Sequence, residues 1–254
     1  MIRAVLFDVG GTFTTVYNSP ELRTAFAKRL SDRLSLYGIE LNAPYEELGV
    51  RLHENAEAYK HHVEETRVEL PNARVWSEFY LRDYAIPEET IAPYAEELSF
   101  LYDYERMISL RRPHLKETLE TLRADGYLLG VVSNVFSRSL TPHLLMEYGI
   151  DGLMDTVILS SEVGVRKPDP RIFEIAMDRI GVTKDETCYV GDTLSRDVLG
   201  SRNAGLALSI QIENPAVAHR DVAFTGPDGP KPDFFIHDLA EIPPILARVN
   251  RKSE

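Results

Sequence analysis

The feature that most constrains this chain is a short apolar run near its start that leads into a carboxylate. Residues 2–7, IRAVLF, run directly into Asp8 and the glycine pair Gly10 and Gly11. A run of this length, bounded by glycine, is typical of a strand buried on both faces of a parallel sheet. Open α/β sheets bind their ligands beyond the carboxyl ends of such strands. The sequence therefore predicts an α/β fold in which Asp8 lies at the ligand-binding edge of the sheet.

The remaining strands of the sheet are expected after residue 111. Apolar runs alternate there with helical patterns: the runs are YLLGVVSN, DTVILSS, TCYVGD, LALSIQI and DFFIH, and the helices include HLKETLETLRADG, PRIFEIAMDRIG and HDLAEIPPILARVN. This alternation predicts βα units and a doubly wound parallel sheet. Residues 214–232 are rich in Pro, Gly and Asp, and we expect them to form an irregular, mobile surface loop.

A helical block interrupts the α/β pattern. Residues 17–110 consist of long amphipathic stretches such as ELRTAFAKRLSDRLSLYG, with Pro71, Pro87 and Pro93 between them. The block holds 18 acidic and 10 basic side chains, a net charge of −8 out of −12 for the chain. We therefore expect two domains, a discontinuous core of residues 1–16 and 111–254 and a helical domain of residues 17–110. The aromatic side chains around Trp76 recur at near-helical spacing, which predicts packing inside the helical domain.

Composition excludes several classes of protein. A net charge of −12 argues against a nucleic-acid surface, because phosphate contacts need clustered Lys and Arg. No apolar run approaches the roughly 20 residues that span a bilayer, and the first residues do not match a secretory signal. We expect a cytoplasmic protein whose partner is a small molecule, with its oligomeric state left open. The single cysteine, Cys188, excludes an intramolecular disulfide and a multi-cysteine zinc site, and it is expected in a buried strand.

Four short motifs carry candidate chemistry, each at or just after an expected strand end. They place Asp8 in LFDVGGT, Ser133 in VVSN, Lys167 in RKPDP, and Asp192 with Asp197 in VGDTLSRD. In phosphoryl transfer by covalent catalysis, a carboxylate attacks, a hydroxyl and an ammonium hold the phosphoryl oxygens, and acidic groups hold a divalent cation. Each motif alone is a weak signal, since Asp, Ser and Asn are common in turns. Their order along one α/β chain predicts a single site.

With these four motifs in this order, the chain resembles the haloacid dehalogenase-like hydrolases over nearly its whole length. The resemblance implies a Rossmann-like core with a helical-bundle cap inserted after the first motif, Mg²⁺ as the cofactor and a small phosphorylated metabolite as the substrate. It also implies that Asp8 is the nucleophile and forms an aspartyl intermediate. The helical block lies where such a cap is expected.

The resemblance assigns the remaining roles residue by residue. The Asp8 and Asp192 carboxylates and the backbone carbonyl of Gly10 are expected to hold Mg²⁺. Ser133 and Lys167 are expected to bind the transferring phosphoryl group, with supporting substrate contacts from two further residues, Thr12 and Asn134. Asp197 is expected to orient Lys167 or to bind a metal-bound water, although a carboxylate in the first turn of a helix also has a structural explanation.

One position departs from the pattern of the phosphatases in this family, which have an acid/base Asp two residues after the nucleophile. This chain has Gly10 there. Hydrolysis of carbon–halogen or carbon–phosphorus bonds therefore stays an alternative, as does a catalytically weak member that only binds a ligand. Within the helical block, His53, His61 or His62 could supply the missing acid, and Lys60 could form a Schiff base with an aldehyde.

Overall fold

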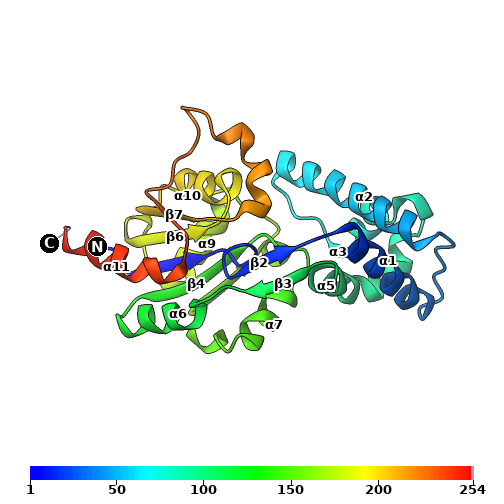
Figure 1. Cartoon of the computed structure of the whole chain (residues 1–254), viewed down its shortest axis with the longest axis horizontal. Helices are drawn as coiled ribbons and strands as arrows, with labels where there is room; N and C mark the ends of the chain where they lie inside the picture. The colour runs from blue at the N-terminus through cyan, green and yellow to red at the C-terminus, as the bar shows by residue number, and fades with distance from the viewer. Residues whose placement is uncertain (253–254) are drawn as a thin grey trace. The chain divides into compact units, whose positions relative to one another are not determined.

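The structure is a computed structural model that describes residues 1–252, and its core is a six-stranded parallel sheet. The order of strands is β5-β4-β1-β6-β7-β8, and every neighbouring pair is parallel. Figure 1 shows the first strand, in blue, among later strands in green and yellow. The strands are β1 (Ala4–Phe7), β4 (Leu128–Ser133), β5 (Thr156–Leu159), β6 (Thr187–Gly191), β7 (Leu208–Ile212) and β8 (Phe234–Ile236). The expected α/β, Rossmann-like core is confirmed.

The central strand β1 is buried along its whole length, as its apolar run predicts. Successive side chains point to opposite faces of a strand, so Ala4 and Leu6 share one face. They pack in one apolar cluster with Ile172 and Phe173 of α9 (Arg171–Ile180). The other core helices are α6 (Leu115–Ala124), α7 (Leu140–Glu147), α8 (Ser160–Val163), α10 (Leu199–Asn203) and α11 (Ile242–Arg251).

The chain divides into two compact units. One comprises Met1–Thr15, Leu110–Asn134 and Pro142–Glu254, and the other comprises Val16–Ser109 with Val135–Thr141. The second unit, the helical unit, contains α1 (Pro20–Ser35), α2 (Tyr45–Thr66), α3 (Asn72–Val75), α4 (Glu88–Ile91) and α5 (Ala95–Glu105). The segment Val135–Thr141 follows the VVSN motif, and the sequence pattern did not predict that it packs with the helices.

Aromatic packing holds the helical unit together. Trp76 is fully buried, and its indole Nε1 donates to Ser99 Oγ at 3.0 Å, so the expectation for Trp76 is confirmed. Phe136, from the segment Val135–Thr141, lies with its ring centroid 6.0 Å from that of Trp76 and 5.1 Å from that of Tyr80. The core of this unit therefore draws on two parts of the chain that are far apart in sequence.

Two features of the fold differ from the sequence prediction. Strands β2 (Thr14–Tyr17) and β3 (Ile108–Arg111) form a separate two-stranded sheet that was not predicted. The segment 214–232 was expected to be an irregular loop, but it begins with two 3-10 helices, Pro215–Arg220 and Val222–Phe224. The side chains of Asn214 and Asp221 in this segment are buried. Asn214 donates to Asp192, and Asp221 accepts from the backbone of Leu194.

Cys188 lies in β6 with its thiol buried, as expected for a strand residue. Within residues 1–252, none of the helices has the length and apolar character that crossing a membrane requires.

Candidate active site

The register of the sheet brings three of the motifs to one edge. Phe7 of β1 pairs with Val131 of β4 and with Val190 of β6. Asp8 directly follows β1, and Ser133 and Asp192 occupy the ends of the neighbouring strands β4 and β6. Because all three strands run in the same direction, their carboxyl ends deliver these side chains to the same place.

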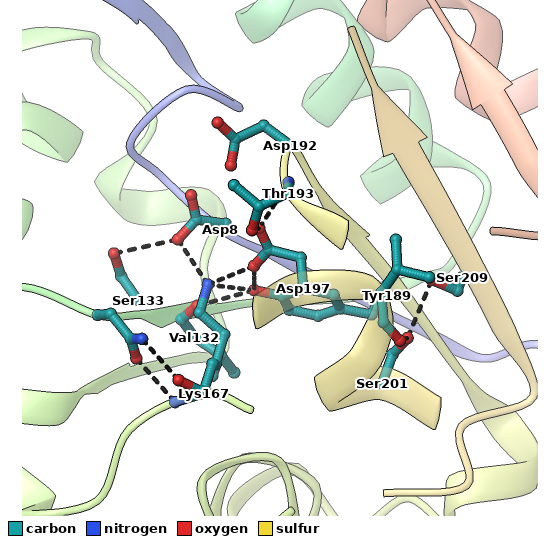
Figure 2. A network of polar contacts seen from close by, with 12 residues as sticks. Asp8, Val132, Ser133, Lys167, Tyr189, Asp192, Thr193, Asp197, Ser201 and Ser209 are labelled. Atoms are coloured by element: carbon teal, nitrogen blue, oxygen red, sulfur yellow. Dashed lines mark hydrogen bonds and ion pairs between the residues drawn. The ribbon is translucent and has the colours of Figure 1, made fainter. Parts of the chain in front are cut away.

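Lys167 is the hub of the polar network at this edge. Its buried Nζ donates to Asp8 Oδ1 at 2.7 Å, to Asp197 Oδ1 at 2.7 Å and to the Tyr189 hydroxyl at 2.6 Å. Figure 2 shows these side chains pointing toward one another. Three acceptors satisfy all three N–H groups of an ammonium. Burial opposes the charge on Lys167, but the Asp197 and Asp8 carboxylates outweigh that effect and raise the pKa of Lys167.

Thr193 holds the Asp197 carboxylate in the position that its contact with Lys167 requires. Its Oδ2 accepts from Thr193 N at 3.0 Å and from Thr193 Oγ1 at 2.6 Å. A Cβ at Gly191 would lie 2.4 Å from Asp197 Cβ, so only glycine leaves room for this carboxylate. Burial of Asp197 acts against ionisation, yet the charges of Lys167 and Arg196 dominate and lower its pKa. Asp197 and Lys167 therefore form an ionised, hydrogen-bonded pair.

The two carboxylate oxygens of Asp8 differ in their contacts. Ser133 Oγ lies 3.4 Å from Asp8 Oδ1, the same oxygen that accepts from Lys167. Within residues 1–252 no group donates a hydrogen bond to Oδ2. Burial raises the pKa of Asp8, and the Lys167 charge opposes that rise. The carboxylate is thus oriented through one oxygen while the other stays open to a substrate.

Asp192 keeps one carboxylate oxygen free of hydrogen bonds within residues 1–252, so this oxygen could bind a cation. Its Oδ2 accepts from Asn214 Nδ2 at 2.7 Å, whereas its buried Oδ1 has no hydrogen-bond partner within residues 1–252. Burial and the nearby charges of Asp197 and Asp8 raise the pKa of Asp192 to about 8. Carboxylate oxygens of these three aspartates lie within 4.8 Å of one another. This acidic set could hold a metal ion, which would balance the buried negative charge.

The two glycines after Asp8 differ in what they require. Gly11 has φ +87°, and a Cβ there would lie 2.0 Å from Asp192 Oδ2 and 2.6 Å from Asn214 Nδ2, so no other residue fits. Gly10 has no positive φ, and a Cβ there would meet nothing within 4 Å. A tight chain reversal therefore explains Gly11 but not Gly10. Nothing steric accounts for glycine at position 10.

Within residues 1–252, neither Thr12 nor Asn134 forms a hydrogen bond with the Asp8 side chain. Asn134 uses both ends of its amide on the backbone of Lys167, accepting from Lys167 N at 2.9 Å and donating to Lys167 O at 3.0 Å. Thr12 Oγ1 is buried and has no hydrogen-bond partner within residues 1–252. These contacts favour Asn134 as a residue that positions Lys167.

Three residues of the site were missed by the sequence argument. Tyr189 joins Lys167 and Asp197 through its hydroxyl, Asn214 holds Asp192, and Arg112 donates to the backbone carbonyl of Gly11 at 2.8 Å through Nη2. Only Tyr189 left a signal, because a tyrosine in an apolar strand needs a partner for its hydroxyl. Arg112 and Asn214 act from expected loop positions, which carry no periodic pattern.

Comparison with known proteins agrees with this geometry. Residues 2–205 match the profile of the family described as haloacid dehalogenase-like hydrolase. The chain belongs to this family. A glyceraldehyde 3-phosphate phosphatase from Methanopyrus kandleri is 31% identical over 212 residues, which cover 81% of this chain and 82% of that protein. This haloacid dehalogenase-like chain is therefore a hydrolase by family.

Solved structures show the same fold. A haloacid dehalogenase-family phosphatase from Thermococcus onnurineus matches with a TM-score of 0.58 and 26% identity, covering 96% of this chain and 98% of that one. A 2-haloacid dehalogenase from Pseudomonas syringae matches with a TM-score of 0.64 and 24% identity, covering 98% and 99%. Likeness of fold alone thus spans both phosphatases and dehalogenases of the family, so the reaction must be argued from the site.

Proposed function

We propose that this hydrolase is a Mg²⁺-dependent phosphatase of a small phosphorylated metabolite, with Asp8 as the nucleophile. The contacts of Asp8 carry the proposal: Lys167 at 2.7 Å and Ser133 at 3.4 Å share one carboxylate oxygen and leave the other open. Support also comes from the 31% identical relative, which is named a glyceraldehyde 3-phosphate phosphatase.

The proposed reaction has two steps that balance without any further reactant than water. The Asp8 carboxylate attacks phosphorus, the bond from phosphorus to the leaving oxygen breaks, and the leaving alkoxide takes a proton from water to become the alcohol. Water then attacks the phosphorus of the aspartyl phosphate, which releases inorganic phosphate and restores the carboxylate. Covalent catalysis of this kind divides one difficult displacement into two easier ones.

Ser133 and Lys167 are proposed to bind the oxygens of the phosphoryl group during both steps. A hydroxyl and an ammonium aimed at these oxygens stabilise the negative charge that they carry in the transition state. Asp197 and Tyr189 keep Lys167 in place, so the donor is oriented before the substrate arrives. Asn134 adds to this by fixing the backbone of Lys167.

Mg²⁺ is the cation that this donor set fits best, because the available ligands are oxygens only. Asp8 and Asp192 are proposed to hold it together with the carbonyl of Gly10, with Asp192 Oδ1 as the carboxylate oxygen that has no other partner. When bound, Mg²⁺ reduces the repulsion between the carboxylates and an anionic phosphoryl group.

Gly10 shapes which phosphate esters are good substrates. No carboxylic acid stands at this position to protonate the leaving oxygen, so esters of acidic alcohols and acyl phosphates should react faster than alkyl phosphates. General acid catalysis contributes roughly 10²–10⁴ in rate, and a poor leaving group needs it most.

The proposal is tested by measuring phosphate release from a panel of phosphorylated metabolites with Mg²⁺ or with EDTA. We expect release only with Mg²⁺, and none from the Asp8→Asn or Asp192→Asn variants. Chloride release from 2-haloacids or phosphate release from phosphonoacetaldehyde would favour the carbon–halogen or carbon–phosphorus alternative. Hydrolysis of a metabolite by both Asn variants at the wild-type rate would refute the site assignment.

A further inference from the structure

A second polar pocket lies wholly inside the helical unit. It is formed where the start of α1, the middle of α2 and the end of α5 meet, and it opens to solvent; the space between its side chains, open solvent included, is about 290 Å³. Its polar lining comprises Asn18, Arg23, His53 and Arg106, and its apolar lining includes Phe26 and Tyr102. Apart from His53, a candidate for the missing acid, none of these residues has a part in the phosphoryl-transfer chemistry proposed above.

The two arginines of this pocket each keep one buried nitrogen without an acceptor among the described residues. The Nε atoms of Arg23 and Arg106 are buried and make no hydrogen bond within the described residues 1–252. No acidic side chain of residues 1–252 forms an ion pair with either guanidinium. Arg106 stacks on the Tyr102 ring, with Cζ 4.6 Å from the ring centroid. Buried nitrogen donors without acceptors are costly and rare in folded proteins.

Such unpaired nitrogens are unusual in a block, residues 17–110, with a net charge of −8. Four other arginines of this block each form an ion pair with a glutamate: Arg29 with Glu105, Arg33 with Glu97, Arg51 with Glu47 and Arg74 with Glu78. Arg67 and Arg82 need no partner because they are exposed to solvent. Among the eight arginines of residues 17–110, only Arg23 and Arg106 combine partial burial with an Nε that has no hydrogen-bond partner within residues 1–252.

The charges around His53 show that the pocket is electropositive. Burial lowers the pKa of His53, and the charges of Arg23, Lys60 and Arg106 lower it further, against the opposing effect of Glu57. The adjacent acid Glu105 pairs with Arg29 at 2.7 Å, and Asp103 Oδ2 accepts from Ser137 N at 3.1 Å. Burial lowers the pKa of Arg106, but nearby groups, among them Asp103 and Glu57, raise it. The Nε donors of Arg23 and Arg106 nevertheless have no acceptor within residues 1–252.

We infer that this pocket binds a small oxyanion, a carboxylate or phosphate group, between Arg23 and Arg106. The planar guanidinium presents N–H groups in a fork that matches two oxygens of such a group. Asn18 can donate its amide N–H to the same ligand, and the rings of Phe26 and Tyr102 fit an apolar carbon beside the anionic group. The ligand is a free small anion of this kind.

Binding is tested on the full-length protein with sodium sulfate and sodium acetate as probes. NMR of the arginine Nε–H groups, assigned by variants, reports the pocket directly, and the fluorescence of Trp76, the only tryptophan, reports the helical unit. We expect saturable shifts of the Arg23 and Arg106 resonances by at least one probe. Affinity should fall at least about tenfold in Arg23→Gln and in Arg106→Gln, because charge-assisted bidentate contacts are strong. Arg82→Gln, at an exposed arginine, is the matched control.

Equal probe affinity in wild type and in folded Arg23→Gln would overturn the inference. So would shifts of the Arg23 and Arg106 resonances that are no larger than that of exposed Arg82. If Arg106→Gln does not fold, Arg23→Gln and Arg23→Lys decide the matter, since Lys keeps the charge but loses the fork. None of these measurements needs turnover, so a failure of the proposed phosphatase activity would not affect them.

Discussion

At the scale of single residues, the candidate site depends on one buried ammonium. Lys167 donates to two carboxylates and one phenol, so its position is determined before any ligand binds. Removing one partner of a buried ion pair typically costs about 3–5 kcal/mol, because a charge is left without compensation. Asp197 therefore matters as a partner of Lys167 rather than as a substrate contact. Thr193 holds its carboxylate, and Gly191 leaves room for it.

Gly10 provides a gain-of-function prediction at this scale. Gly10→Asp should raise the rate of hydrolysis of alkyl phosphates by at least about tenfold, because it adds an acid that can protonate the leaving oxygen. The space beside a Cβ at Gly10 is free within 4 Å, so the variant should fold. The measurement is kcat for an alkyl phosphate and for p-nitrophenyl phosphate, and the gain should be smaller for the latter.

Gly11→Asp is the matched negative control, because its Cβ would collide with Asp192. A folded Gly10→Asp enzyme without any gain, beside a wild type that already hydrolyses alkyl phosphates efficiently, would contradict the argument. The proton would then come from another group, and His53, His61 and His62 would be the residues to substitute.

Residues at strand ends could be predicted from the sequence, whereas those that support them could not. Asp8, Ser133 and Asp192 each follow an apolar run that marks a strand, and parallel strands end at a common edge. Tyr189 lies within such a run, where a tyrosine is normally a packing residue. Its contact with Lys167 depends on the path of a distant loop, which no local pattern encodes.

At the scale of elements, the segment after β7 contributes more than its composition indicates. Asn214 accepts from Ala216 N at the start of the 3-10 helix Pro215–Arg220 and donates to Asp192. Asp221 accepts from Leu194 N at 2.7 Å and so holds the π-helical turn Leu194–Val198, which carries Asp197. Abundant Pro, Gly and Asp predict a loop, but they do not predict that its polar side chains are buried.

Asn214→Ala should therefore weaken metal binding about 10- to 100-fold, as the loss of a residue that orients a ligand typically does. The measurement is the Mg²⁺ concentration that gives half-maximal activity. Asp228→Ala, at an exposed position of the same segment, is the control and should have no effect. A wild-type Mg²⁺ requirement in Asn214→Ala would show that Asp192 needs no support from this segment.

Short exposed elements also escaped prediction. Strands β2 and β3 have four residues each and are mostly exposed, so they lack the apolar alternation that marks a half-buried strand. The longer elements α1, α2 and the six core strands were predictable because each buries an apolar face or a whole apolar run.

At the scale of the whole molecule, the helical unit includes a segment that the sequence assigned to the core. Phe136 is buried against Tyr80 and Trp76, although it follows the VVSN motif. A sequence pattern reports which residues are apolar, not which of two cores they join. We propose that a fragment of residues 17–110 is incomplete, because it lacks this ring.

Phe136→Ala should destabilise the helical unit by about 3–5 kcal/mol, the usual cost of truncating a buried aromatic side chain. Urea unfolding followed by Trp76 fluorescence should show an earlier transition. Phe235→Ala, at a side chain that is 51% exposed in β8, serves as the control and should leave the Trp76 transition in place. An unshifted transition in Phe136→Ala would mean that the ring does not contribute to this core.

The proposed function requires that the phosphoryl group is transferred to the Asp8 carboxylate and then to water. Borohydride reduces an acyl phosphate but not a free carboxylate, so it marks the residue that carries the intermediate. The enzyme should be mixed with excess p-nitrophenyl phosphate and Mg²⁺, quenched in acid, reduced with borohydride and analysed by peptide mass spectrometry. The account predicts homoserine at position 8, and none when substrate or Mg²⁺ is omitted. Turnover of the substrate with an unmodified position 8, or with the modification at another carboxylate, would contradict it.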